Sequence, residues 1–446
     1  MTVRTRDQYL DALRAGALMV VVFGHWLATL PRLQEGRMVD TEHLLKIWEP
    51  AGLLTWLVQV VPLFVFVSAA ASTEGTARRL RQGHRQLHWW AGRALALARP
   101  TATYLAAIAV FALISLVTGG RLLGALNQSL TIHLWFLVMF LIVQALLPAS
   151  VEADRRFGRG AVFALLGIAV FVDYTRAGLP GPAGVLVLGQ GVVGSAGTPL
   201  GAVGWINAFA VWLLPQQLGI AWKRGRFRGA WTGAGLIVLG IAWLAATVAS
   251  GYPTAMVGFD LEGRSNMLPP TLALIGVMWI QAGAVLVMAR PARWLLDRRR
   301  IAGAVKMLGA LSMPVYLWHK LAELPAAWLG ERLGVPIDAG VPGTAGFWQG
   351  RLWWIALCTL MIIPVISAVA AFEMRRKQGV PSATAPVPIL AGGAALLAGL
   401  VVSMLLGALP GTLVGVLLVL AASWLLRGAD KYLGQEPERS KDYRNR

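Results

Sequence analysis

Residues 9–30 read YLDALRAGALMVVVFGHWLATL, and this stretch decides the fold class. It is long enough to cross the hydrocarbon core of a bilayer as an α-helix, which takes about 20 mostly apolar residues. Basic residues precede the apolar run, as in a signal peptide. The run is too long for one, however, and no small-residue cleavage site closes it. We therefore expect a retained first membrane-spanning helix.

Similar apolar stretches recur along all 446 residues, of which 57% are hydrophobic and only 14% charged. Soluble domains carry about 25% charged residues, so lipid is the expected solvent. We predict an all-α polytopic membrane protein with about twelve transmembrane helices. The predicted spans are 9–30, 51–72, 96–118, 131–149, 160–175, 202–222, 230–250, 271–290, 303–329, 350–372, 387–408 and 410–427.

The net charge of +19 comes from short Lys and Arg clusters between alternate spans. With the N-terminus inside, about 29 Lys and Arg fall on the cytoplasmic side and about seven outside, the usual bias of membrane proteins. We predict a protein of the bacterial cytoplasmic membrane with both termini cytoplasmic. Basic loops lying against anionic membrane lipid account for the charge, so no nucleic-acid partner is expected. The single cysteine, Cys358, excludes a disulfide framework.

Three ionisable residues lie in the first span: Asp11, Arg14 and His25. Helical geometry puts Arg14 and His25 within about 20° of one face, with Asp11 about 40–60° away. Asp11 and Arg14 can pair at the cytoplasmic end, where they could equally anchor the helix at the headgroups. His25 lies about 16 Å further along. Because ionisable groups are costly inside a membrane, each is a functional candidate.

The ninth span contains LSMPVYLWHKLAE, residues 311–323. Its polar residues are spaced 4, 3 and 4 apart and form one stripe: Ser312, Tyr316, His319 and Glu323. Lys320 is predicted to lie beside the stripe, and Pro314 to kink the helix. An aqueous face near the outer mouth would produce the same pattern. Two histidines and a carboxylate near the outer side also predict proton transfer. The sequence contains no HExxH motif, so a metal site is not expected.

Four stretches resemble the acyltransferase-3 family of integral-membrane acyltransferases. The opening RDQYLDALRAGALMVVVFGH (6–25) is similar to the first-helix signature of that family. Three more agree in order: VPLFVFVSA (61–69), HLWFLVMFL (133–141) and LSMPVYLWH (311–319). The resemblance covers about residues 6–375.

The resemblance implies a ten-helix acyltransferase core, to which the uncharged C-terminal stretch adds a two-helix hairpin. The expected divisions are 1–378 for the core, 379–388 for a Pro-rich linker, 389–427 for the hairpin and 428–446 for a disordered cytoplasmic tail. The implied reaction moves an acyl group, commonly acetyl, from cytoplasmic acyl-CoA to a hydroxyl outside the membrane. A glycan, a glycolipid or another hydroxylated compound would be the acceptor.

Roles follow by position from the resemblance. His25 matches the essential first-helix histidine of the family, as general base or transient acyl carrier, and Arg14 its motif arginine. Arg93 and Arg99 in GRALALARP stand where the family has a basic pair for coenzyme A, at a wider spacing. His319 or Glu323 would orient His25 or relay its proton, and Tyr316 or an indole N–H would stabilise the oxyanion. Orienting roles fall to Asp11, Ser312 and Trp135.

Three rival functions compete with the acyltransferase prediction. About twelve spans would suit a secondary transporter, although we find no matched pair of broken helices in two halves. A glycosyltransferase using a lipid-linked sugar would need an acidic motif in an outer loop, and the outer loops show none. A non-catalytic scaffold would leave the two polar stripes unexplained.

Overall fold

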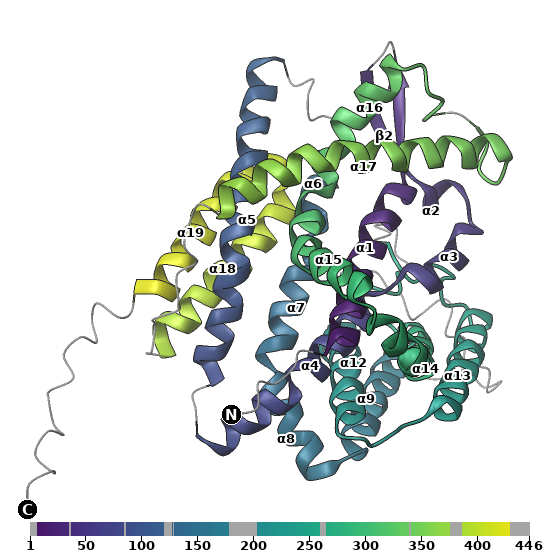
Figure 1. Cartoon of the computed structure of the whole chain (residues 1–446), viewed down its shortest axis with the longest axis vertical. Helices are drawn as coiled ribbons and strands as arrows, with labels where there is room; N and C mark the ends of the chain where they lie inside the picture. The colour runs from purple at the N-terminus through teal and green to yellow at the C-terminus, as the bar shows by residue number, and fades with distance from the viewer. Residues whose placement is uncertain are drawn as a thin grey trace, which may run out of the picture. The chain divides into compact units, whose positions relative to one another are not determined.

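The computed structural model describes residues 7–34, 37–83, 86–119, 127, 129–177, 203–258, 265–338, 340–374 and 386–428 (Figure 1). These residues are almost entirely helical. Contacts divide the chain into two compact units, which are described separately: residues 1–82 with 142–369, and residues 83–141 with 370–446. The all-α polytopic class predicted from the sequence is confirmed.

The first unit holds most of the helices. Their bounds are α1 (Gln8–Ala28), α2 (Leu44–Ile47), α3 (Ala51–Val58), α4 (Val61–Arg81), α8 (Leu147–Phe157), α9 (Gly160–Ala177), η2 (Gly204–Ile206), α12 (Asn207–Lys223), α13 (Ala230–Ala249), α14 (Ala273–Leu296), α15 (Arg299–Trp318), η3 (His319–Ala322) and α16 (Glu323–Arg332). Two further helices cross the division between the units, α7 (Trp135–Ala145) and α17 (Ala345–Met374). Within the first unit, α1 packs against α4 and α15, and α4 also packs against α12.

Eight helices in the described part of the chain are long and apolar enough to cross a membrane, or nine if a bent pair counts as one span. The predicted number was about twelve. The apolar helix 160–175 and the 17-residue α12 are too short for this criterion. The last two predicted spans count as one apolar run, Pro386–Arg427.

Helix α1 begins and ends at identifiable residues. The Asp7 carboxylate caps the N-terminus by accepting hydrogen bonds from the backbone N–H groups of Tyr9 (3.1 Å) and Leu10 (3.5 Å). The helix ends at Ala28, two residues before the predicted end of the span. Thr29 then starts strand β1 (Thr29–Gln34), which pairs antiparallel with β2 (Arg37–His43). The sequence analysis did not predict this hairpin.

Helices α13 and α14 pack through glycines. A Cβ atom at Gly240 would lie 2.6 Å from the carbonyl oxygen of Gly276, and one at Gly233 would lie 2.7 Å from that of Gly283. Real side chains do not fit at such distances, so the two backbones touch. Small residues at helix contacts are the usual means of close packing in membranes.

The ninth predicted span is not one regular helix. Helix α15 runs through Pro314 and ends at Trp318, and the 3₁₀ turn η3 then leads into α16. The predicted stripe from Ser312 to Glu323 is therefore interrupted at His319. The side chains after His319 therefore project at angles that differ from those of a regular α-helix.

Several loops predicted to face the cytoplasm lie together in the first unit. Arg159 Nε donates to the carbonyl oxygen of Arg226 (3.1 Å), and Arg224 Nη1 lies 3.0 Å from the buried Asp154 carboxylate. The contacts join two loops, residues 154–159 and 223–229, that the sequence analysis placed on one side of the membrane. The side of the membrane on which they lie remains a prediction.

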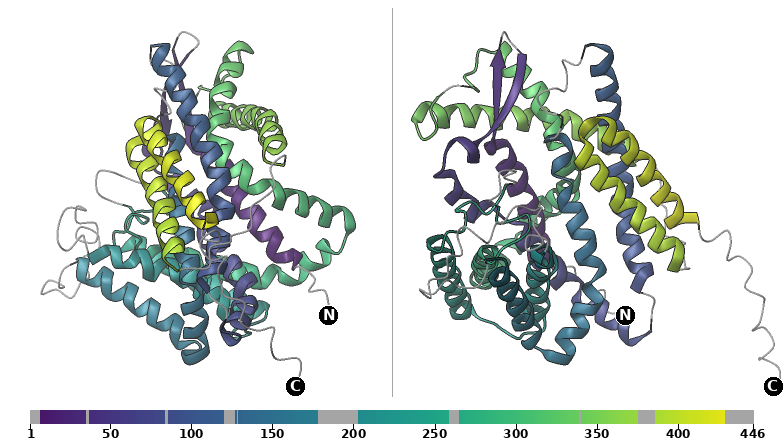
Figure 2. Two further views of the ribbon diagram at one scale, coloured as in Figure 1. Left: turned by 90° about the vertical axis from the view of Figure 1, so that its left-hand side faces the viewer. Right: turned by 180° about the vertical axis from the view of Figure 1, so that it is seen from behind.

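The second unit contains α5 (Gln86–Val117), α6 (Ser129–Ile132), α18 (Pro386–Leu406), η4 (Gly407–Gly411) and α19 (Thr412–Gly428). Helices α18 and α19 run antiparallel, with Gly399 close to Gly415, and α19 packs along α5 (Figure 2). The C-terminal pair thus shares a compact unit with α5. Helix α18 begins inside the predicted linker. Residues 379–385 of that linker and the predicted tail from 429 onward lie outside the described residues.

Candidate active site

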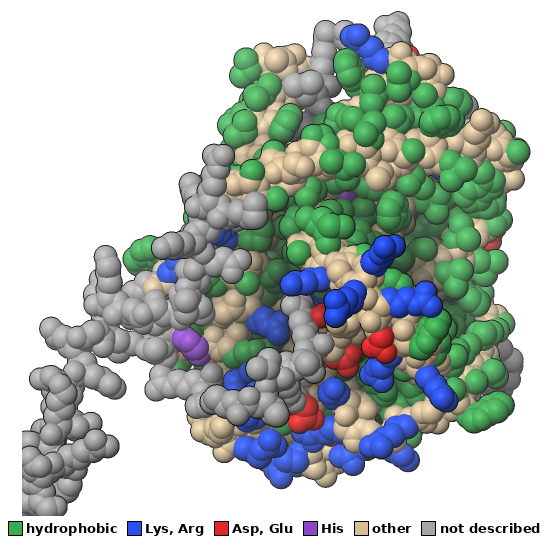
Figure 3. Space-filling model, in the orientation of Figure 1, with side chains coloured by type: hydrophobic (Ala, Val, Ile, Leu, Met, Phe, Trp, Pro, Cys, Tyr) green, Lys and Arg blue, Asp and Glu red, His purple; other side chains and the backbone are tan. Residues whose placement is uncertain are grey.

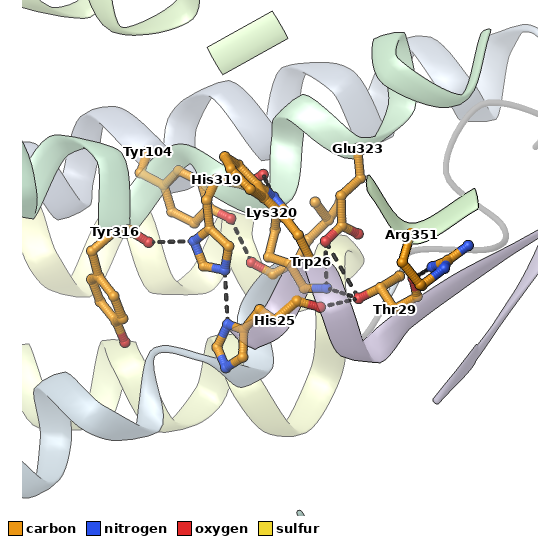
Figure 4. Close-up of polar contacts among 10 residues, drawn as sticks. His25, Trp26, Thr29, Tyr104, Tyr316, His319, Lys320, Glu323 and Arg351 are labelled. Carbon is orange, nitrogen blue, oxygen red and sulfur yellow. Dashed lines mark hydrogen bonds and ion pairs between the residues drawn. The ribbon is translucent and has the colours of Figure 1, made fainter. Parts of the chain in front are cut away.

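The end of α1 meets the turn η3 through two histidines, which are 294 positions apart in the sequence (Figure 4). His25 Nδ1 lies 2.8 Å from His319 Nε2. The two rings are stacked, with their centroids 5.0 Å apart and their planes inclined by 28°. His319 is fully buried and His25 half-buried. The structure therefore brings together two of the residues singled out in the sequence.

A backbone carbonyl fixes the proton positions of this pair. His319 Nδ1 lies 2.7 Å from the carbonyl oxygen of Tyr316, which can only accept a hydrogen bond. His319 Nδ1 must therefore carry a hydrogen, and in the neutral ring Nε2 is the acceptor. It follows that His25 donates from Nδ1 and has its lone pair on Nε2. This tautomer makes His25 Nε2 a base.

Backbone contacts on both sides hold the histidine pair. The indole Nε1 of Trp26 donates to the carbonyl oxygen of His319 at 3.1 Å. The hydroxyl of Thr29 lies 2.9 Å from the carbonyl oxygen of His25, to which it donates. Trp26 and Thr29 are buried. The Trp26 bond thus joins the last turn of α1 to η3, and the Thr29 bond closes that last turn.

Thr29 contacts a buried ion pair formed by Lys320 and Glu323. Lys320 Nζ lies 2.8 Å from Glu323 Oε1 and 2.8 Å from Thr29 Oγ1. The prediction that Lys320 lies beside the functional stripe is therefore wrong. A 3₁₀ turn has three residues per turn, so side chains three apart align, and this aligns Lys320 with Glu323.

Arg351 was not among the predicted residues. It is buried, and its Nη1 donates to the carbonyl oxygen of Thr29 at 2.8 Å, while Nη2 bonds that of Ile337. The signal that could have found it is an arginine just inside an apolar span. Three buried atoms of this region have no hydrogen-bond partner among the described residues: Glu323 Oε2, Arg351 Nε and Trp354 Nε1.

His43 is a second residue that the sequence analysis missed. It lies on β2 opposite Thr29, and its Nδ1 accepts a hydrogen bond from the N–H of Leu45. Burial, helped by the positive charge of Lys320, lowers the pKa of His43 to about 4. The ring is therefore neutral at neutral pH.

The other predicted residues of the ninth span play smaller parts in this geometry. Tyr316 contacts His319 through its carbonyl group, and its ring centroid lies 6.1 Å from that of His319. Glu323 bonds to Lys320 and Thr29 rather than to a histidine. Ser312 donates within its own helix, to the carbonyl oxygen of Gly309.

Five predicted residues remain: Arg14, Arg93 and Arg99, predicted to bind coenzyme A, and Asp11 and Trp135, predicted to have orienting roles. Arg14 and Asp11 are on α1, and the guanidinium carbon of Arg14 lies 5.7 Å from the centroid of the Phe64 ring. The remaining three belong to the second unit, so their relation to His25 stays a prediction. Arg93 lies over Trp89, the backbone carbonyl oxygen of Arg99 accepts a hydrogen bond from the Thr103 hydroxyl, and Trp135 packs edge-on against Phe136.

Within the described residues, no three His, Cys, Asp or Glu side chains gather where they could share a metal ion. The site is therefore a pair of histidines in a helical membrane protein, in which the buried His319 holds His25. The family model described as an acyltransferase domain matches residues 7–371, and the chain belongs to this acyltransferase-3 family.

The protein is therefore an acyltransferase that transfers groups other than amino-acyl groups, and family membership favours this function over that of a secondary transporter. His25, His319, Glu323 and Arg351 all fall within the matched residues. No match was found among curated proteins or among solved structures.

Proposed function

We propose that this protein is a membrane O-acyltransferase. It takes an acyl group, acetyl in the first instance, from acyl-CoA and transfers it to a hydroxyl of a glycan, glycolipid or similar acceptor on the opposite side of the membrane. The observation that carries the proposal is the hydrogen bond between His25 and His319. It supplies a base whose proton-accepting nitrogen is fixed by a buried partner.

In the proposed mechanism, His25 Nε2 removes the proton of the acceptor hydroxyl as its oxygen attacks the thioester carbonyl. The positive charge that forms on His25 is stabilised through Nδ1 by His319 Nε2. His319 in turn donates to the carbonyl oxygen of Tyr316. The tetrahedral intermediate collapses, the C–S bond breaks, and the departing sulfur takes the proton from His25. The arrangement follows the logic of a nucleophile–base–orienting triad, with a second histidine in the orienting place.

The same pair supports a second route. His25 Nε2 could attack the thioester itself and form an acyl-imidazole, which the acceptor hydroxyl then cleaves. The two routes differ in whether acyl-enzyme forms before the acceptor is added.

The test uses purified protein in detergent or proteoliposomes with radiolabelled acetyl-CoA and extracts of envelope lipid and glycan. Wild type should label the acceptor, and His25→Ala should lower the rate by about 10²- to 10⁴-fold, the range attributed to one positioned acid–base group. His88→Ala on α5 serves as the control histidine substitution and should leave the rate near wild type. Equal labelling by wild type and His25→Ala would exclude the proposed role.

His319 is a positioning residue, since it acts through His25. His319→Gln should lower kcat more than it raises the donor KM, and it should change the pH dependence of kcat. A merely structural role would reduce the amount of active protein without changing the shape of that profile. Rapid quenching without acceptor then separates the two routes, because only the acyl-imidazole route gives protein-bound label.

A further inference from the structure

The opposite end of α1 opens onto two adjoining cavities that share Asp7 and Arg293, with volumes of about 230 and 370 Å³. The smaller is lined by Asp7, Trp222, Lys223, Gly225, Arg228 and Arg293. The larger adds Tyr9, Asp297 and Arg299. Figure 3 shows Lys and Arg side chains gathered over the middle and lower part of this face, with a few carboxylates among them.

The loop after α12 separates its cations into two groups. Arg224 and Arg226 lie 3.0 and 3.4 Å from the buried carboxylate of Asp154 and hold the loop in place. Lys223 and Arg228 line the smaller cavity instead, and in the described part of the chain neither has an ion-pair partner. Two cations of this loop are thus paired with a buried carboxylate, and the other two are available to bind an anionic ligand.

Gly225 makes this arrangement possible. Its φ of +71° is a conformation that favours glycine, and a Cβ atom there would lie 2.0 Å from Arg228 Nη2. The backbone conformation therefore favours glycine at this turn, and the exposed Arg228 guanidinium lies beside it at the rim of the cavity.

Two aromatic side chains border the cavities: Trp222, which stacks on Phe66, and the buried Tyr9, whose ring centroid lies 5.4 Å from the guanidinium carbon of Arg293. Arg293 also lies 3.6 Å from the Asp7 carboxylate, with which it forms an ion pair. Four cations and two carboxylates line the two cavities, so positive charge is in excess there. Guanidinium and ammonium groups are suited to binding a phosphorylated ligand.

Helix α1 connects this place with the histidine pair. Tyr9 and His25 are sixteen residues apart, which is about 24 Å along an α-helix. A diphosphate with an extended pantetheine arm reaches about 20 Å, judged from its bond lengths. A donor anchored at the cavities would therefore bring its thioester close to His25.

We propose that these two cavities bind the phosphates at the nucleotide end of the acyl-CoA donor, with Lys223 and Arg228 contacting them. This rests on the proposed function for the identity of the donor. It locates the anionic group at the N-terminal end of α1, away from the motif arginines that the family resemblance suggested.

The test compares acetyl-CoA with S-acetylpantetheine, which has the same thioester but lacks the nucleotide. For Lys223→Gln/Arg228→Gln, kcat/KM for acetyl-CoA should fall at least about tenfold, mainly through KM, since hydrogen bonds to charged groups contribute that much or more. The value for S-acetylpantetheine should stay unchanged, which also shows that the variant is folded. Binding of unacylated coenzyme A to the purified protein should weaken by a similar factor.

The matched control, Arg290→Gln/Arg300→Gln, removes two exposed charges that do not line the cavities, and it should keep the wild-type preference for acetyl-CoA. The proposal is overturned if the cavity variant keeps that preference or if the control loses it equally. If the wild type binds coenzyme A at Lys223 and Arg228 but transfers acetyl from neither donor, the proposed function fails and the binding site stands.

Discussion

Two helix contacts in the first unit are built in opposite ways. Helices α13 and α14 meet backbone to backbone at Gly240 and Gly276 and again at Gly233 and Gly283. The end of helix α1 and the start of β1 meet η3 through side chains that hydrogen-bond across the contact: His25 with His319, and Thr29 with Lys320.

The two kinds of contact, backbone to backbone and side chain to side chain, have different uses in a membrane protein. Lipid offers little hydrophobic drive for helices to associate, so close van der Waals contact or interhelical hydrogen bonds must supply it. Glycine contacts hold two helices together without placing any reactive group between them. Polar contacts place bases and charges at the junction but depend on every buried charge having its partner. The histidine pair of the proposed mechanism lies where the second kind of contact is used.

The largest stability effect is expected at the ion pair of the polar junction. Lys320→Met leaves the fully buried Glu323 without its cation, and breaking a buried pair in this way costs about 3–5 kcal/mol. Thermal unfolding in detergent measures the loss. The double variant Lys320→Met/Glu323→Gln should recover most of it, because no lone charge remains. A single variant as stable as wild type would show that the pair is dispensable.

A smaller loss is expected at the glycine contact. Gly240→Ala forces a Cβ atom within 2.6 Å of a carbonyl oxygen, and such overpacking costs about 1–3 kcal/mol. The rate per folded molecule should stay at the wild-type value, because no group of the site is touched. Gly235→Ala on the same helix is the control, since a Cβ there has open space around it and alanine favours the helix. Equal destabilisation by both would refute the close contact.

The third expected effect, no larger than the second, is a dependence of stability on pH that only the region around the polar junction should show. His43 has an unfolded pKa near 6.5 and a folded pKa of about 4, so the unfolded chain binds the extra proton between these values. Stability should therefore fall as the pH drops through that window, by about 2 kcal/mol at pH 5. His43→Asn, which can still accept from Leu45, should flatten this slope, whereas Gly240→Ala should leave it unchanged. Parallel pH curves for wild type and His43→Asn would contradict the assignment.

Much of the fold and part of the site could be predicted from local pattern. Apolar stretches of span length located the long helices, and ionisable residues inside them singled out His25, His319 and Glu323. Lys320 was misplaced because the prediction assumed α-helical periodicity, whereas η3 is a 3₁₀ turn. Arg351 and His43 were missed because their importance comes from contacts with Thr29 and Lys320, far away in sequence.

The sequence by itself determined the membrane environment, the helical class and the presence of a histidine near the end of α1. These depend on composition and on periodicity within one helix, which neighbouring residues encode. Only the tertiary structure decided that His25 meets His319, and that the carbonyl of Tyr316 leaves the lone pair on His25 Nε2. It also decided that cavities lined by cations lie at one end of α1 and the histidine pair at the other. Such pairings join segments about 200 to 300 residues apart, and their geometry is set by how helices pack rather than by any local pattern.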